Sequence, residues 1–202
     1  PKELPITEDH PRKPLNPYGL SKNRVEEYML NLSQSNDNWK LISLRYFNPL
    51  GANIHGFAGD FSFEKHENIM PKLLNAYLDK SKFFEIYGND YDTEDGSGIR
   101  DYIHIEDLVE GHICALNHLK SINGFDSFNL GTGMGYSVYE LIRCFESTTK
   151  QKLPIKISPR RVGDIAKSFA SSEKARKILN WKAEKNLESM IQSAIKFAIQ
   201  NV

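Results

Sequence analysis

The sequence lacks the features that mark several protein classes. Two cysteines, Cys114 and Cys144, are too few for a disulfide framework. No apolar run approaches the ~20 residues of a membrane-crossing helix, and no segment resembles a secretory signal. Acidic and basic residues balance at 26 each, so no field of one sign is available to hold a nucleic acid or an anionic membrane. We therefore expect a cytoplasmic protein that binds neither.

Metal-binding patterns are also missing. None of the six histidines has the spacing of a zinc site. The acidic turn 90–95 resembles a calcium loop, but Gly96 is out of register for an EF-hand and the closing glutamate is absent. We expect no metal site.

The chain begins with proline instead of methionine, and its first 17 residues, PKELPITEDHPRKPLNP, predict a loop that enters a helix. We therefore expect a fragment. Beyond this loop, segments with helical and strand-like patterns alternate. Asp107 is the expected N-cap of one helix, and Ser137 with Glu140 forms a capping box at another. The expected helices lie at 18–34, 69–80, 108–119, from 137, 171–179 and 187–199, and the expected strands at 39–47, 83–88, 99–105, 127–130 and 155–158. This alternation predicts an α/β fold with partly parallel strands.

Tyr18 and Lys22 form a Tyr-x-x-x-Lys pattern on the first predicted helix, where residues four apart share a face. A tyrosine alone is a poor base at neutral pH. An ammonium ~6 Å away favours the phenolate by roughly 3 kcal/mol at an effective dielectric of ~20. Such a phenolate can take a proton from a sugar hydroxyl while hydride leaves the same carbon.

The segment GTGMG, Gly131 to Gly135, follows a predicted strand and precedes a helix. Its glycines have the spacing G-x-G-x-G and not the G-x-G-x-x-G of a dinucleotide-binding loop, so a tight turn is expected.

Five segments occur in a recognisable order: NPYGLSK, LRYFNPLGAN, IYGNDYDTEDGSGIRDYIHIEDL, FNLGTG and PRRVGD. Together they resemble the UDP-glucose 4-epimerases of the extended short-chain dehydrogenase/reductase superfamily. The resemblance implies the C-terminal part of a Rossmann-type NAD-binding fold plus a smaller mixed α/β substrate-binding domain. Residues 1–55 would be the remnant of the NAD-binding domain. Residues 56–202 would mainly bind the UDP-sugar, with a segment near 105–150 returning to the core sheet.

The same resemblance implies roles for individual residues. Tyr18 would be the catalytic acid/base, and Lys22 would bind the nicotinamide ribose and tune Tyr18. Tyr46 and Phe47 would face the nicotinamide end of NAD. The implied substrate-binding residues are Asn48, Asn68, Glu85, Ile86, Tyr87, Arg100, Arg161, Asp164 and Ser168.

Within that set, Glu85 to Tyr87 would flank the uracil. Arg100 and Arg161 would hold the diphosphate, since a guanidinium makes forked hydrogen bonds to phosphate oxygens. Asp164 would bind a ribose hydroxyl. The implied reaction oxidises C4, rotates the 4-keto sugar and re-reduces it on the other face, with NAD as cofactor and a homodimer as the assembly of the complete enzyme.

The sequence departs from the family in several places. The glycine-rich fingerprint and a Ser/Thr that contacts the C4 oxygen would precede Pro1, so the chain alone is expected to be inactive. Glu67-Asn68 replaces two adjacent asparagines, and Glu85 stands where a small residue is more common. Ser168 is small where a bulky aromatic excludes N-acetylated hexoses, so the complete enzyme is expected to accept UDP-N-acetylglucosamine. A nucleotide-sugar dehydratase and a non-catalytic nucleotide-sugar-binding module remain the alternatives.

Overall fold

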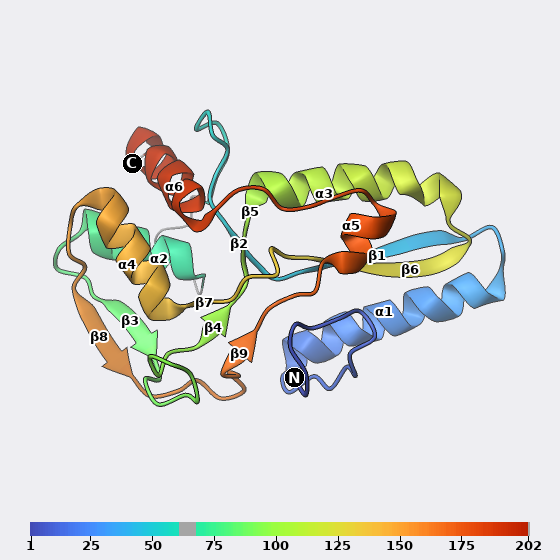
Figure 1. Cartoon of the computed structure of the whole chain (residues 1–202), viewed down its shortest axis with the longest axis horizontal. Coiled ribbons are helices and arrows are strands. Elements are labelled where there is room, and N and C mark those ends of the chain that lie inside the picture. The colour runs from blue at the N-terminus through green and yellow to red at the C-terminus, as the bar shows by residue number, and fades with distance from the viewer. Residues whose placement is uncertain (61–67, 202) are drawn as a thin grey trace.

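The computed structural model describes residues 1–60 and 68–201, in which short strands lie between helices (Figure 1). Glu67, one of the departures from the family pattern, lies outside the described residues. Within the described residues, no helix combines the length and the apolar composition needed to cross a membrane.

One hydrophobic cluster surrounds two parallel strands, β1 (Lys40–Tyr46) and β6 (Gly124–Leu130). Successive side chains of a strand point to opposite faces, and β1 uses both. Ile42 and Leu44 pack in the cluster that includes residues of α3 (Ile105–His118), and Ser43 and Arg45 bond Glu26 of α1 (Pro17–Ser35). The two helices therefore cover opposite faces of the pair (Figure 1). The 3-10 turn η1 (Leu119–Ser121) follows α3. The buried members are Ile103, Leu108, Ala115, Phe128, Leu130, Ala175, Leu179 and Trp181, the last three from α5 (Glu173–Ile178) and the segment after it.

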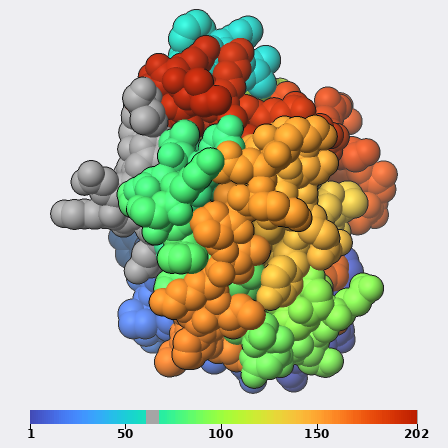
Figure 2. All heavy atoms as spheres, turned by 90° about the vertical axis from the view of Figure 1, so that its left-hand side faces the viewer, coloured from blue at the N-terminus to red at the C-terminus, as the bar shows by residue number. Residues whose placement is uncertain are grey.

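The second hydrophobic cluster lies at the other end of the molecule, around the parallel strands β3 (Phe84–Tyr87) and β8 (Ile155–Ser158). Three helices enclose it: α2 (Ile69–Leu78), α4 (Val138–Thr149) and α6 (Leu187–Asn201). Figure 2 shows the surface of this end, with α4 and β8 in orange beside α2 in green and α6 in red above them. Its largest fully buried side chains are Tyr102, Phe84, Phe145, Leu73, Ile86, Leu141, Met190 and Ile191.

Short ladders lie between the two clusters (Figure 1). β2 (Asn48–Leu50) pairs in parallel with β5 (Tyr102–His104). β4 (Ile99–Arg100) is the middle strand of a second ladder, antiparallel to β7 (Tyr136–Ser137) and parallel to β9 (Lys167–Ser168). The ladders between the two hydrophobic clusters are therefore only two or three residues long.

The strand expected over 99–105 is divided at Asp101, which is a correction to the sequence-based prediction. The backbone N–H of Asp101 donates to Ser168 O at 3.0 Å, and its carbonyl accepts from Asn48 N at 2.9 Å. The strand thus changes partner at this residue, from β9 on one side to β2 on the other.

The N-cap expected at Asp107 is also wrong. The helix α3 begins at Ile105, three residues before the expected start, and the ring Nδ1 of His104 accepts the hydrogen bond from Glu106 N at 3.0 Å. The Asp107 carboxylate instead accepts from Lys185 N at 2.9 Å. The capping box of Ser137 and Glu140 is confirmed at the start of α4.

Candidate functional site

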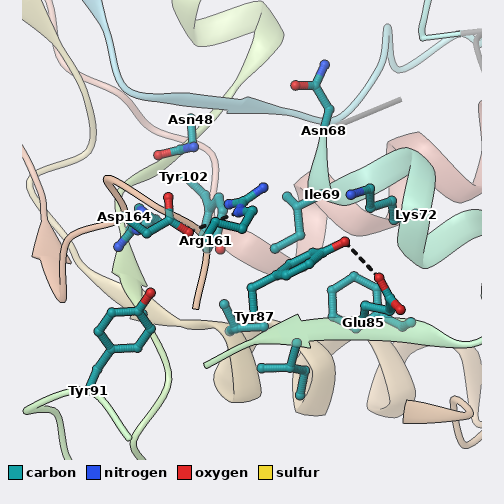
Figure 3. A pocket seen from close by; sticks show the side chains of 15 residues that line it. Asn48, Asn68, Ile69, Lys72, Glu85, Tyr87, Tyr91, Tyr102, Arg161 and Asp164 are labelled. Atoms are coloured by element: carbon teal, nitrogen blue, oxygen red, sulfur yellow. Dashed lines mark hydrogen bonds and ion pairs between the residues drawn. The ribbon is translucent and has the colours of Figure 1, made fainter. Parts of the chain in front are cut away.

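A cleft opens between the start of α2, β3 and the segment around Arg161 (Figure 3). Eight of the nine substrate residues implied by the sequence line it, and Ser168 is the one that does not. The full lining is Asn48, Asn68, Ile69, Lys72, Phe84, Glu85, Ile86, Tyr87, Tyr91, Gly98, Arg100, Tyr102, Val138, Arg161 and Asp164. These residues come from six helices and strands and from the loops between them, so only the folded chain brings them together.

The β3 end of this cleft carries a flat aromatic surface with charges around it. The Nζ of Lys72 lies 5.2 Å from the ring centroid of Tyr87, and the guanidinium carbon of Arg161 lies 4.8 Å from it. The Tyr87 hydroxyl donates to Glu85 Oε2 at 2.7 Å (Figure 3), and Lys156 Nζ lies 3.2 Å from Glu85 Oε1. The hydrogen bond from Tyr87, with that from Lys156, lowers the pKa of Glu85. Glu85, which departs from the family pattern, is therefore held in place by hydrogen bonds from Tyr87 and Lys156.

The two arginines of the cleft use few of their donors within the described residues. Arg161 Nε pairs with Asp164 Oδ2 at 3.0 Å, and Arg100 Nη1 donates to Ile99 O at 2.8 Å. A guanidinium has five N–H donors, so each arginine retains donors for a ligand. The arrangement suits an anion that accepts hydrogen bonds from both guanidinium groups.

Two tyrosines in the cleft wall are buried with their hydroxyl groups unpaired in the described part of the chain. These are Tyr91 and Tyr102. Burial raises the pKa of Tyr102, and the nearby charge of Arg100 acts in the opposite direction. Sequence reasoning did not single out Tyr91, because a tyrosine in a polar turn carries no local sign of burial.

A second cleft adjoins the first, and Asn48 lines both. It contains Lys22, Tyr46, Phe47 and Ser168, whereas Tyr18 is not part of its lining. Its full lining is Ile6, Thr7, His10, Pro11, Arg12, Lys13, Pro14, Gly19, Lys22, Asn23, Glu26, Arg45, Tyr46, Phe47, Asn48, Asn129 and Ser168.

The Tyr-x-x-x-Lys pair lies at the start of α1. Asn16 caps the helix, because its Oδ1 accepts from Gly19 N at 2.7 Å, and Pro17 occupies the first turn. Lys22 Nζ lies 5.3 Å from the ring centroid of Tyr18, and the Tyr18 side chain is 73% exposed. No hydrogen bond or ion pair engages Lys22 among residues 1–60 and 68–201. Its ammonium is thus available to a bound group as well as to Tyr18.

Glu26 lies one helical turn after Lys22 and is buried, yet the arginines around it keep it from binding that lysine. Arg12 Nη1 lies 2.7 Å from Glu26 Oε1, Arg45 pairs with both carboxylate oxygens, and Ser43 donates to Oε2 at 3.1 Å. Burial raises the pKa of Glu26, but the hydrogen bonds and charges of Arg45 and Arg12 outweigh it and lower the pKa overall. The helical spacing from Lys22 was the only signal for this residue in the sequence.

The side chain of Tyr46 points away from α1. Its hydroxyl lies 2.6 Å from His112 Nε2, and His112 Nδ1 lies 2.8 Å from Leu108 O. A carbonyl only accepts, so in the neutral ring Nδ1 carries the proton and Tyr46 donates to Nε2. The Tyr46 hydroxyl thus connects the end of β1 to α3, and Tyr46, Phe47 and Asn48 line the second cleft.

The GTGMG segment is a tight turn whose amides are already bonded. Asp101 Oδ1 accepts from Thr132 N at 2.9 Å and from the Thr132 hydroxyl at 2.6 Å. Asp101 Oδ2 accepts from Gly133 N and Ala170 N, both at 3.0 Å. Burial raises the pKa of Asp101, while these hydrogen bonds act to lower it. The amides of Thr132, Gly133 and Met134 are therefore already bonded within the protein.

No group of three or more His, Cys, Asp or Glu side chains is placed to hold a metal ion in the described part of the chain. The chemistry of both clefts rests on arginine, lysine, carboxylate, amide and phenol groups. An anionic ligand with hydroxyl groups fits these side chains.

Comparisons with known proteins agree with this geometry. The chain has an α/β fold that matches structures of UDP-glucose 4-epimerases over part of their length. The UDP-glucose 4-epimerase of Bifidobacterium longum, solved with NAD+ and UDP, superposes with a TM-score of 0.94 at 41% identity, covering 100% of this chain and 60% of that one. The UDP-glucose 4-epimerases of Bacillus subtilis and Drosophila melanogaster are each 41% identical over 100% of this chain, and 60% and 58% of their own lengths are covered.

A family model described as "NAD dependent epimerase/dehydratase family" matches residues 1–131. The chain belongs to this family, which confirms the resemblance and the α/β fold expected from the sequence. It spans about 60% of the length of the curated relatives that it matches.

Proposed function

We propose that this chain carries the UDP-sugar-binding part and the Tyr–Lys pair of an enzyme that interconverts UDP-galactose and UDP-glucose with NAD. The observation that supports this most is the continuity of the two clefts at Asn48. One holds an aromatic face and two arginines, which suits a uridine diphosphate. The other holds Lys22 and Ser168, which suits a sugar next to a proton-transfer group. The relatives named above are described as UDP-glucose 4-epimerases, and the one from Bifidobacterium longum was solved with NAD+ and UDP.

In the proposed reaction, each residue acts on a defined part of the substrate. Tyr87 offers its flat face to the uracil, Arg100 and Arg161 hold the diphosphate, and Asp164 accepts a hydrogen bond from a ribose hydroxyl. The Tyr18 phenolate accepts the proton of the C4 hydroxyl, and the Lys22 ammonium stabilises that phenolate. The diphosphate grip leaves the 4-keto sugar free to rotate before the proton returns.

The residues around Lys22 fit one end of NAD. The Lys22 ammonium has no hydrogen-bond or ion-pair partner among the described residues and suits ribose hydroxyls, and Tyr46 and Phe47 line the same cleft. Bound there, NAD would accept the hydride from C4 and give it back. The chain's own part is to hold the ribose through Lys22 and to position the proton acceptor, Tyr18, beside it.

Binding to the chain itself is the first test. Calorimetric titration with UDP should show saturable binding, and Arg161→Met should weaken it by about tenfold or more, because a charged hydrogen bond to phosphate is lost. Arg176→Met is the matched control, since Arg176 pairs with Glu173 on α5, outside both clefts. Equal UDP affinity in all three proteins would contradict the assignment of this cleft.

Turnover is the second test, and it requires the complete open reading frame. The complete protein should contain NAD and convert UDP-galactose to UDP-glucose, and Tyr18→Phe and Lys22→Met should each reduce kcat by at least about a hundredfold. Binding of UDP without turnover of UDP-galactose would favour the non-catalytic binding module. Release of water and formation of a deoxy sugar would favour the dehydratase.

A further inference from the structure

Tyr91 has a hydroxyl group that the protein leaves unpaired. The residue is 7% exposed, and its hydroxyl is buried without a hydrogen-bond partner in the described residues. It nevertheless lines the first cleft, and Figure 3 shows the hydroxyl pointing into the cleft in the direction of Asp164. A buried polar group without a partner destabilises a folded protein, so such groups are rare.

The ring of Tyr91 is held so that the hydroxyl cannot turn elsewhere. The guanidinium carbon of Arg160 lies 4.2 Å from the ring centroid, and Arg160 Nε pairs with Asp90 Oδ1 at 2.7 Å. Tyr91 N donates to Gly96 O at 2.9 Å. Gly88 has φ +82° and lies close to both side chains, since a Cβ there would lie 2.7 Å from Tyr91 Cε2 and 2.7 Å from Arg160 Cγ. The backbone and both neighbours thus fix the direction of the phenol.

The charged side chains that share the cleft indicate which kind of ligand atom the Tyr91 hydroxyl would contact. The base end of the cleft lies at β3, where Glu85 and Tyr87 bond each other. Arg100 and Arg161 line the cleft together with Tyr91 and retain unused donors. A group held by two guanidinium groups carries acceptor oxygens, and a phenol is a good donor to such oxygens.

We propose that the Tyr91 hydroxyl is a ligand-binding group that donates a hydrogen bond to an anionic oxygen of the nucleoside diphosphate. This role rests on the proposed function of the cleft and adds a neutral donor to its two arginines. Arg160, which contacts the ring, acts as a positioning residue for Tyr91.

The test uses the 202-residue chain, its Tyr91→Phe variant, and UDP and uridine as probes. The variant should bind UDP about tenfold more weakly, while its affinity for uridine should equal that of the unchanged chain. Its Tm without ligand should be equal or higher, because the substitution removes an unpaired buried hydroxyl. Tyr28→Phe, at a side chain that is 67% exposed on α1, is the matched control and should change neither measurement.

Several outcomes would overturn the proposal. Unchanged UDP affinity in Tyr91→Phe, with normal binding by the unchanged chain, would refute the role of Tyr91 and leave the proposed function intact. An equal loss for uridine and UDP would place the contact at the nucleoside. A Tm several degrees lower would show that the hydroxyl has a structural partner. Absence of UDP binding by the unchanged chain would overturn the role of Tyr91 and the binding function together.

Discussion

Replacing Asp101 with asparagine should destabilise the protein strongly, although the two side chains have nearly the same shape. The carboxylate accepts four hydrogen bonds, two from Thr132, one from Gly133 N and one from Ala170 N. An asparagine offers a single oxygen. In the better of its two orientations, this oxygen still accepts from Gly133 N and Ala170 N. The NH2 group then faces the N–H of Thr132.

The magnitude follows from those contacts. The substitution loses one amide hydrogen bond to a charged acceptor, worth about 1.5–3 kcal/mol, and brings two donors together. Part of the loss is recovered, because the Thr132 hydroxyl can accept from the new NH2 group. We therefore expect the free energy of unfolding to fall by about 2–4 kcal/mol.

Urea unfolding followed by circular dichroism measures this change, provided that the m-value stays constant. Asp92→Asn is the control, since it removes the same charge from an exposed position and should change stability by less than about 0.5 kcal/mol. A loss below about 1 kcal/mol for Asp101→Asn would refute the reasoning, because it would mean that the four hydrogen bonds to the carboxylate do not hold the ladders together.

Two further predictions concern acid stability and substrate choice. Burial lowers the pKa of His104, so its contribution to stability should be complete above the unfolded value of about 6.5 and lost as the pH falls below it. The urea midpoint of the unchanged chain should therefore fall more between neutral and mildly acidic pH than that of His104→Asn, and parallel curves would contradict this. In the complete protein, Ser168→Tyr should reduce turnover of UDP-N-acetylglucosamine relative to UDP-galactose by about tenfold or more, because the side chain borders the second cleft. An unchanged ratio in a competition assay would exclude this role of Ser168.

Local signals in the sequence predicted the elements well where one segment determines its own structure. Ser137 and Glu140 cap α4 through contacts three residues apart, and Asn16 and Pro17 start α1 in the same way. The family blocks also placed most candidate ligand residues, since each block lies in one loop or strand. Their roles remain predictions until binding is measured.

The sequence could not show features that depend on distant segments. Asp101 divides a strand because its backbone meets Asn48 on one side and Ser168 on the other. His104 replaces Asp107 as the N-cap because Asp107 is engaged by the backbone of Lys185. In each case the competing partner is more than 50 residues away, beyond the reach of patterns in a short window.

The change of partner at Asp101 has a mechanical consequence. Arg100 and Tyr102, its two neighbours, pair with different strands and yet both line the first cleft. The cleft wall therefore includes adjacent residues from two different ladders. A ligand bound along that wall would contact both ladders at once and would resist their separation.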